Sequence, residues 1–196
     1  MYKFNIHLFA LISLLILSFG CTKNKKSALI FDTDANNEID DQHALAYLFF
    51  NSDTFDIKGI TVNATVNGGD IEQHYDEAKR IMQLCGWENK TILIKGANGD
   101  FKKIEKNIKS DNFDGHKAVK FIIKEALKYN SKQKLIILAV GKLTNVALAV
   151  KKEPLIIPNI RIVWLGSNYP ESGEYNLDND IISMNYLLET KVEFEI

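Results

Sequence analysis

Short apolar runs that suit strands alternate with segments of helical periodicity from Ser27 onward. The strand-like runs cover residues 28–31, 57–62, 91–94, 135–140 and 160–165. The helix-like segments cover residues 44–50, 71–84, 118–129, 143–150 and 181–188. Repeated strand–helix units predict a three-layer α/β fold, in which a mostly parallel, open, Rossmann-like sheet carries helices on both faces. Residues 96–115 lack a clear period and are rich in Lys, Asn, Asp and Gly, so we expect a surface excursion there.

The composition is typical of a globular chain. The 196 residues include 24 Lys and Arg against 25 Asp and Glu, which gives a formal net charge of -1. A surface that binds nucleic acid needs a basic excess, so this balance argues against a nucleic-acid partner. The only cysteines are Cys21 and Cys85, which excludes a disulfide scaffold and a cysteine-rich metal site.

The N-terminus reads as a targeting segment. Residues 1–20 have a positive start followed by an apolar run over residues 8–19, the pattern of a signal peptide. A small residue then precedes Cys21, which resembles a bacterial lipoprotein signal with this cysteine as the lipidated residue. Residues 21–27 would form a lipidated polar tether and residues 28–196 the folded domain. An uncleaved anchor helix is the alternative, and both predict a cell-envelope protein that contacts the membrane only through its anchor.

A cluster of acids lies between the first strand-like run and the first helix. Its members are Asp32, Asp34, Glu38, Asp40 and Asp41. In open parallel sheets ligands bind outside the carboxyl ends of the strands, which is where this cluster lies. Carboxylates so close repel one another unless a cation neutralises them, and oxygen ligands favour Ca²⁺ or Mg²⁺ over zinc. Helix capping is the alternative, but it accounts for Asp40 and Asp41 and not for Asp32 and Asp34.

Four segments carry polar residues in a recognisable order. They are residues 30–45 (IFDTDANNEIDDQHAL), 59–67 (GITVNATVN), 138–147 (LAVGKLTNVA) and 173–180 (GEYNLDND). In that order they resemble the DTDPG-x-DD signature with its Ala-Leu helix, the G-[IV]-T strand with its Asn, the L-x-x-G-P-L-T-N-x-A segment and the A-E-F-N-x-x-x-D block of one family. This is the inosine/uridine-preferring nucleoside hydrolase family, and the resemblance spans nearly the whole chain after the tether.

The resemblance implies an enzyme of purine or pyrimidine nucleoside catabolism that hydrolyses the N-glycosidic bond of ribonucleosides to ribose and free base. It implies Ca²⁺ held by the side chains of Asp34 and Asp41 and by the backbone carbonyl of Val140, with a Ca²⁺-held water as nucleophile. Asp34 would also be the catalytic base. The residues implied to bind the ribose hydroxyls are Asp40, Asn67, Asn168, Glu174 and Asn176. A nucleoside is therefore the expected partner, and a homo-oligomer stays open.

The chain departs from the family pattern in three places. The loop between Asp34 and Asp40 is two residues longer than usual, and Lys142 stands where Pro is common. The sequence ends at Ile196, whereas family members continue with another calcium-ligating Asp and, in many, a His that helps the base to leave. We therefore expect a C-terminally short domain with an incomplete site.

Two other functions stay open at this point. A truncated or degenerate hydrolase could be a surface lipoprotein that binds a ribosyl ligand or calcium without turnover. Haloacid-dehalogenase-like phosphatases also place Asp-x-Asp after a first strand, but they favour Thr or Val where this chain has Asn36. They do not predict the segments over residues 138–147 and 173–180.

Some residues near these motifs have a structural interpretation. We expect Asn145 to brace the turn into its helix. We also expect His43, His74 and His116 to lie at the surface and Trp164 to lie in the core.

Overall fold

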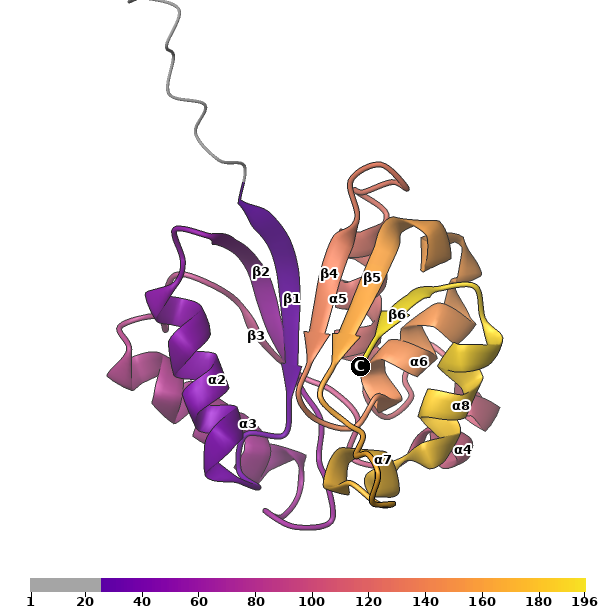
Figure 1. Cartoon of the computed structure of the whole chain (residues 1–196), viewed down its shortest axis with the longest axis horizontal. Helices are drawn as coiled ribbons and strands as arrows, with labels where there is room; N and C mark the ends of the chain where they lie inside the picture. The colour runs from indigo at the N-terminus through magenta and orange to yellow at the C-terminus, as the bar shows by residue number, and fades with distance from the viewer. Residues whose placement is uncertain (1–25) are drawn as a thin grey trace, which may run out of the picture.

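A six-stranded, wholly parallel sheet runs through the chain (Figure 1), whose computed structural model describes residues 26–196. The strands are β1 (Ser27–Thr33), β2 (Phe55–Val62), β3 (Leu93–Lys95), β4 (Leu135–Ala139), β5 (Ile160–Trp164) and β6 (Glu193–Glu195). Their order across the sheet is β3-β2-β1-β4-β5-β6. The chain first builds outward from β1 to β3 and then returns to place β4 on the other side of β1. The strand order therefore reverses between β1 and β4, the point at which open α/β sheets bind ligands.

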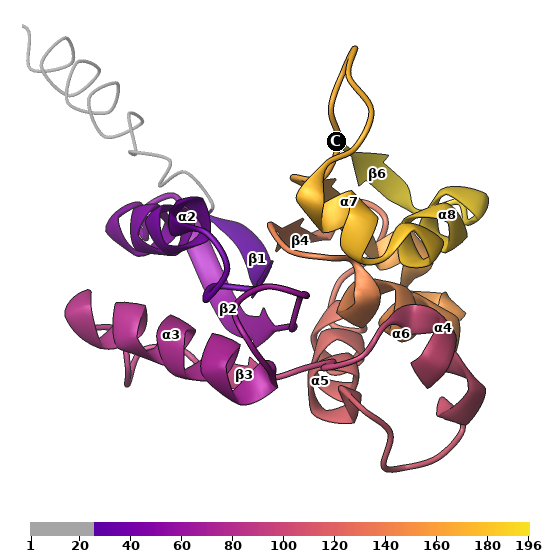
Figure 2. The same ribbon diagram turned by 90° about the horizontal axis from the view of Figure 1, so that it is seen from below.

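Helices cover both faces of the sheet, as the sequence predicts. They are α2 (Ile39–Phe50), α3 (Ile71–Leu84), α4 (Phe101–Ile104), α5 (His116–Ala126), α6 (Thr144–Lys152), α7 (Tyr175–Asn179) and α8 (Ile181–Glu189), with 3-10 turns η1 (Glu105–Asn107) and η2 (Pro154–Asn159). Helices α2 and α3 lie together on one face, while α5, α6 and α8 lie on the other (Figure 2). The predicted three-layer α/β architecture is confirmed.

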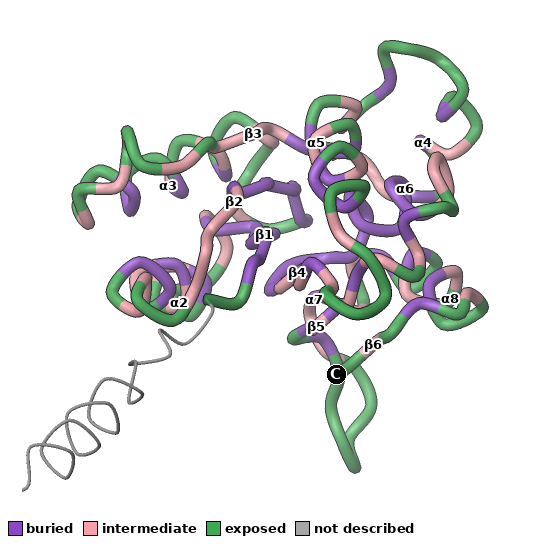
Figure 3. Tube along the Cα trace, turned by 90° about the horizontal axis from the view of Figure 1, so that it is seen from above, coloured by how far each residue is buried: buried purple, intermediate pink, exposed green. Residues whose placement is uncertain are grey.

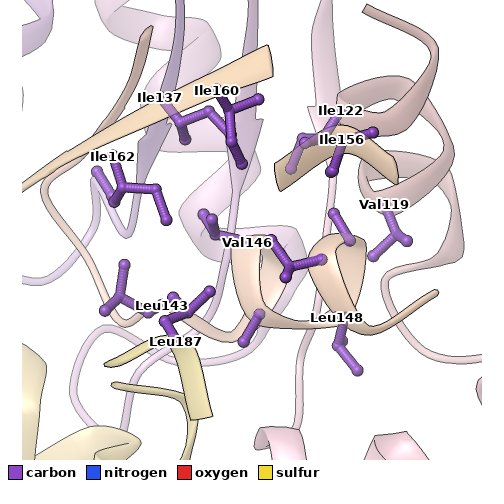
Figure 4. Close-up of a cluster of buried hydrophobic side chains, with 14 of the residues drawn as sticks. Val119, Ile122, Ile137, Leu143, Val146, Leu148, Ile156, Ile160, Ile162 and Leu187 are labelled. Atoms are coloured by element: carbon purple, nitrogen blue, oxygen red, sulfur yellow. The ribbon is translucent and has the colours of Figure 1, made fainter. Parts of the chain in front are cut away.

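Two hydrophobic clusters hold the layers together. One packs Leu45, Phe49 and Met82 of α2 and α3 against β1 and β2. The larger one surrounds α6, whose residues from Thr144 to Val150 are all buried between the sheet and its neighbouring helices (Figures 3 and 4). Burial of apolar side chains on both faces accounts for strands such as β4 that read as continuous apolar runs.

The structure differs from the sequence prediction in residues 96–115. This segment holds α4 and η1, and its Phe101, Ile104 and Phe113 are buried in the larger cluster. The expectation of a surface excursion is wrong for these apolar side chains, because α4 packs on α6 and α8.

The N-terminal predictions lie outside the described residues. These are the signal peptide over residues 1–20, and Cys21. Within residues 26–196, none of the helices has the length and apolar content that a bilayer span needs.

Candidate active site

Asp32, inside β1, is a buried brace between neighbouring strands. Its carboxylate accepts hydrogen bonds from Thr61 Oγ1 (2.5 Å), Asn145 Nδ2 (2.8 Å) and Asn63 Nδ2 (3.0 Å). Burial raises the pKa of this carboxyl to about 7, against the lowering effect of the three donors. Because both of its oxygens are already engaged, Asp32 joins β1 to β2 and α6 rather than facing a ligand.

Asn145, in the first turn of α6, completes this brace. Besides Asp32, its amide nitrogen donates to the Val62 carbonyl at 3.1 Å, and its oxygen accepts from the Ala97 N–H at 2.8 Å. A Cβ at Gly96 would meet this amide at 2.4 Å, so only glycine allows the close approach. The side chain of Asn145 does not brace the turn into α6, as the sequence predicts, but joins this helix to the ends of β1, β2 and β3.

Asp34, directly after β1, has one engaged and one free oxygen. Its Oδ2 accepts a hydrogen bond from Thr65 Oγ1 at 2.5 Å, whereas its buried Oδ1 has no partner. A Cβ at Gly141 would lie 2.8 Å from this Oδ1, so the orphan oxygen faces the backbone that follows β4. Burying a carboxylate oxygen without a hydrogen-bond donor costs free energy. The unpartnered oxygen therefore indicates a ligand-binding position between the ends of β1 and β4.

Asp41, in the first turn of α2, lies beside Asp34. Its Oδ1 accepts from Thr33 Oγ1 at 3.0 Å, and only 4% of the residue is exposed. Burial is the main cause that raises the pKa of both carboxyls, and the charge of Asp34 raises that of Asp41 further. Two neighbouring carboxylates repel each other when both are ionised, and a bound cation removes this repulsion.

The other oxygen atoms near this pair come from backbone and amide groups. The Val140 carbonyl stands at the end of β4, next to Gly141, and the buried Asn63 Oδ1 also lacks a partner. Across residues 26–196, no three His, Cys, Asp or Glu side chains form a cluster that could hold a metal ion. A cation here would therefore have two carboxylates and otherwise neutral oxygens, a donor set that suits a hard ion.

The segment that contains α7 places two of the predicted ribose-binding residues at the carboxyl ends of the strands. Asn176 is buried, and its Nδ2 donates to the carbonyls of Val140 (2.9 Å) and Leu165 (3.0 Å). Glu174 caps α7, since its carboxylate accepts from the backbone N–H groups of Asn176 and Leu177. Asn176 therefore contacts the residue after β4, and Glu174 precedes it at the start of α7, where its carboxylate keeps lone pairs free for hydroxyl donors.

The remaining three predicted residues lie farther out. Asp40 and Asn67 are exposed, and the Asn67 backbone N–H donates to Tyr175 Oη at 2.8 Å, which ties its loop to α7. Asn168 is exposed, and its Nδ2 donates to the Gly173 carbonyl at 2.7 Å. The structure thus brings Asp34, Asp41, Val140, Asn176 and Glu174 to one edge of the sheet and leaves Asp40, Asn67 and Asn168 on its rim.

A family model matches most of the described chain. The family model described as inosine-uridine preferring nucleoside hydrolase matches residues 29–194. The chain belongs to this family. No curated protein sequence matches it significantly.

Solved structures of nucleoside hydrolases share the fold. A plant nucleoside hydrolase has a TM-score of 0.69 at 18% identity, over 87% of this chain and 59% of that one. A purine-preferring ribonucleoside hydrolase from Gardnerella vaginalis gives 0.67 at 23% identity, over 86% and 59%. An inosine-uridine preferring nucleoside hydrolase from Bacillus anthracis gives 0.65 at 20% identity, over 86% and 63%. The chain thus spans about three-fifths of the length of these relatives.

Two residues at the candidate site were not predicted to lie there. His74 is fully buried in α3, with its Nδ1 2.7 Å from the Asp34 carbonyl oxygen, so the expectation of a surface histidine is wrong. Its spacing from Ala78 and Ile81 on the apolar face of α3 was the available signal. Lys142 is buried and donates to the Gly99 carbonyl at 2.7 Å, and burial lowers its pKa. It lines an open pocket together with Thr65, the hydrogen-bond donor to Asp34. His43 and Trp164 lie at the surface and in the core, as expected.

The raised pKa of Asp32 predicts a pH-dependent stability. Between about pH 4 and 7 the folded chain keeps a proton on Asp32 that the unfolded chain has released. The free energy of unfolding should therefore fall as the pH rises through this range, by up to about 4 kcal/mol from this group. Urea unfolding in chelator at several pH values, compared with Asp32→Asn, measures it. If the free energy of unfolding changed with pH in the same way for both proteins, the raised pKa of Asp32 would be contradicted.

Proposed function

We propose that this chain hydrolyses the N-glycosidic bond of ribonucleosides to ribose and the free base. The observation that carries the proposal is the buried, unpartnered Asp34 Oδ1, which lies beside Asp41 and the backbone after β4. Membership of the nucleoside hydrolase family and the shared fold support it. An open pocket is lined by Thr65, which donates a hydrogen bond to Asp34, and by Lys142; Asp34 and Asp41 themselves are not among its lining residues.

A bound Ca²⁺ ion is part of the proposal. Asp34, Asp41 and the Val140 carbonyl would hold it, and the unpartnered Asn63 Oδ1 is a further oxygen close to Gly141. All of these donors are oxygen atoms, which fits a hard cation, and the raised pKa values of the two carboxyls fit a site that is completed by positive charge. When bound, the ion orients a water molecule and makes it more acidic.

The residues of the chain would then act as follows. Asp34 accepts a proton from the attacking water, whose oxygen bonds to the anomeric carbon. The bond from this carbon to the base nitrogen breaks, and its electron pair leaves with the base, which takes up a proton. Glu174 and Asn176 Oδ1 would accept hydrogen bonds from ribose hydroxyls, because both N–H groups of Asn176 Nδ2 already donate to the carbonyls of Val140 and Leu165. Asp40, Asn67 and Asn168 would contact the sugar from the rim of the site. Contacts of this kind lower the barrier where they tighten as the sugar ring flattens.

Hydrolysis can be tested with the full chain and three substrates: inosine, uridine and p-nitrophenyl riboside. We expect Ca²⁺-dependent release of ribose from at least one nucleoside, and a loss on the order of 10²-fold or more after chelation, because base and water lose their alignment. Re-addition of Ca²⁺ should restore the rate. Calorimetric binding of Ca²⁺ and ribose with no cleavage of any substrate would replace this function by a non-catalytic one.

We also propose a cell-envelope location for the chain. The support is the sequence alone, namely the apolar run over residues 8–19 followed by Cys21 and a basic tether. The lipid on Cys21 would anchor the domain to the membrane surface.

A further inference from the structure

Three neighbouring strands end around the proposed cation position. β1 lies between β2 and β4, and Asp34, Asn63 and Gly141 each come one or two residues after the end of one of these strands (Figure 1). The backbone N–H of Asn63 donates to the Thr33 carbonyl at 2.9 Å, which continues the pairing with β1 past the end of β2. The sheet therefore fixes the place of the Asn63 side chain beside the end of β1.

The buried amide of Asn63 has one engaged and one unpartnered end. Its Nδ2 donates to Asp32 Oδ2 at 3.0 Å, whereas its buried Oδ1 has no partner. An ionised carboxylate only accepts hydrogen bonds, so an ionised Asp32 holds the amide with its nitrogen toward Asp32. The oxygen is then the end of the amide that is left for another group.

Gly141 leaves open the space into which two unpartnered oxygens face. A Cβ at this residue would lie 2.8 Å from Asp34 Oδ1, 3.0 Å from Asn63 Nδ2 and 3.1 Å from Asn63 Oδ1. Gly141 is not among the described glycines with a positive φ, so its backbone conformation does not require glycine. The missing side chain is therefore what allows Asp34 and Asn63 to lie so close to this backbone.

Asn63 Oδ1 differs from the two backbone carbonyls that follow β4. The Val140 carbonyl accepts a hydrogen bond from Asn176 Nδ2 at 2.9 Å, and the Gly141 carbonyl accepts one from Trp164 Nε1 at 2.9 Å. Asn63 Oδ1 has no such donor, although it is equally buried. A buried amide oxygen without a donor costs free energy unless a ligand contacts it.

We infer that Asn63 binds the cation through Oδ1, and that Gly141 leaves room for the ion between this oxygen and Asp34 Oδ1. Amide oxygens are ordinary Ca²⁺ ligands, and one ion that contacts both atoms satisfies two buried acceptors at once. A neutral ligand also adds no third negative charge to the pair of carboxylates. The inference rests on the Ca²⁺ ion of the proposed function and adds a ligand to those that the resemblance implies.

Calorimetric titration of Ca²⁺ into the full chain at pH 8 separates a ligand from a structural brace. Asn63→Ala should raise the Kd for Ca²⁺ by about tenfold or more, since even groups that only orient a metal ligand are worth about 10–100-fold in affinity. Asn63→Asp lacks the donor to Asp32 but keeps an oxygen, so its Kd should stay at or below that of the wild type. Thr61→Val is the matched control, because it removes another donor to Asp32 and no oxygen beside Gly141. It should leave the Kd nearly unchanged.

A luminescence experiment locates the ion. Tb³⁺ binds oxygen sites in place of Ca²⁺ and becomes luminescent when a nearby indole is excited. Trp164 donates to the Gly141 carbonyl, and Trp87→Phe leaves Trp164 as the only indole of the chain. In that background we expect a Tb³⁺ signal that Ca²⁺ displaces and that Gly141→Ala abolishes, because the added Cβ fills the space. Gly99→Ala adds a Cβ beside Asp114 instead and should not change the signal.

The outcomes separate this inference from the proposed function. Unfolding in chelator first establishes that each variant is folded. If Asn63→Ala binds Ca²⁺ as the wild type does, or if Asn63→Ala and Asn63→Asp lose affinity equally, Asn63 is only a brace and the inference is overturned. Ca²⁺-dependent hydrolysis by the wild type would still stand in that case. A wild-type chain that binds neither Ca²⁺ nor Tb³⁺ overturns the cation site and this inference together.

Discussion

Replacing Asp34 by Asn is expected to lower kcat/KM for ribonucleosides by about 10³-fold or more, the range of a lost general base. The substitution keeps the shape of the side chain and an oxygen to accept the Thr65 hydrogen bond. It removes the negative charge from the orphan Oδ1, which is the atom proposed to hold the cation and to take the proton from water. Steady-state hydrolysis of inosine and of p-nitrophenyl riboside measures the effect.

The same variant should also lose its stabilisation by Ca²⁺. A ligand at 100 times its Kd stabilises a folded protein by about 2.7 kcal/mol, which a thermal unfolding experiment detects. Asp34→Asn should abolish most of this shift without lowering the stability of the metal-free protein, since a costly buried charge is removed. Glu38→Gln is the control, because Glu38 lies in the same loop but is exposed. Full activity of Asp34→Asn would remove Asp34 from the mechanism.

Much of the three-layer fold could be predicted because the local spacing of apolar residues matches the side chains that are buried in the folded chain. The bounds predicted for α3 match the structure at both ends, because its apolar spacing begins directly after Asp70. The Asp70 carboxylate accepts from the N–H groups of Glu72 and Gln73, while the Gln73 side chain accepts from the Asp70 N–H, a capping box that fixes the start. Sequence and tertiary structure favour the same helix.

Elements that depend on distant partners were missed. β6 reads as charged residues, yet it pairs with β5, where Arg161 contacts Glu193 and Glu195. The buried Phe101 lies in a segment without a period, and its neighbours on α6 and α8 decide its burial. No sequence pattern shows these contacts before the chain is folded.

The candidate site was likewise predictable only in part from the sequence. Acids at the end of the first strand indicate a cation site, but sequence alone does not separate Asp32, whose oxygens are saturated by donors from other elements, from Asp34, whose Oδ1 is free. The difference comes from Thr61, Asn63 and Asn145, which reach Asp32 only in the folded chain. One strand end thus supplies both a structural brace and a candidate catalytic group.

That brace makes Asn145→Ala the substitution with the largest expected loss of stability. It removes three buried hydrogen bonds at once and leaves the Ala97 N–H without a partner. The Asp32 Oδ1 keeps its bond from Thr61, and the Val62 carbonyl keeps its bond from the Gly96 N–H. Three lost hydrogen bonds cost about 1 kcal/mol each and one unsatisfied buried N–H costs about 1–3 kcal/mol, so we expect a loss of about 3–5 kcal/mol. For a chain of this size that corresponds to a drop in Tm of roughly 10 °C. Urea and thermal unfolding in chelator measure it.

Asn168→Ala is the matched control for that experiment. Asn168 also donates a side-chain hydrogen bond to a backbone carbonyl, that of Gly173, but it does so at an exposed position. Water replaces an exposed partner, so we expect a change within about 0.5 kcal/mol. If Asn145→Ala were as mild as this control, the ends of β1, β2 and β3 would not depend on the Asn145 amide. The close approach of Gly96 to that amide would then need another cause.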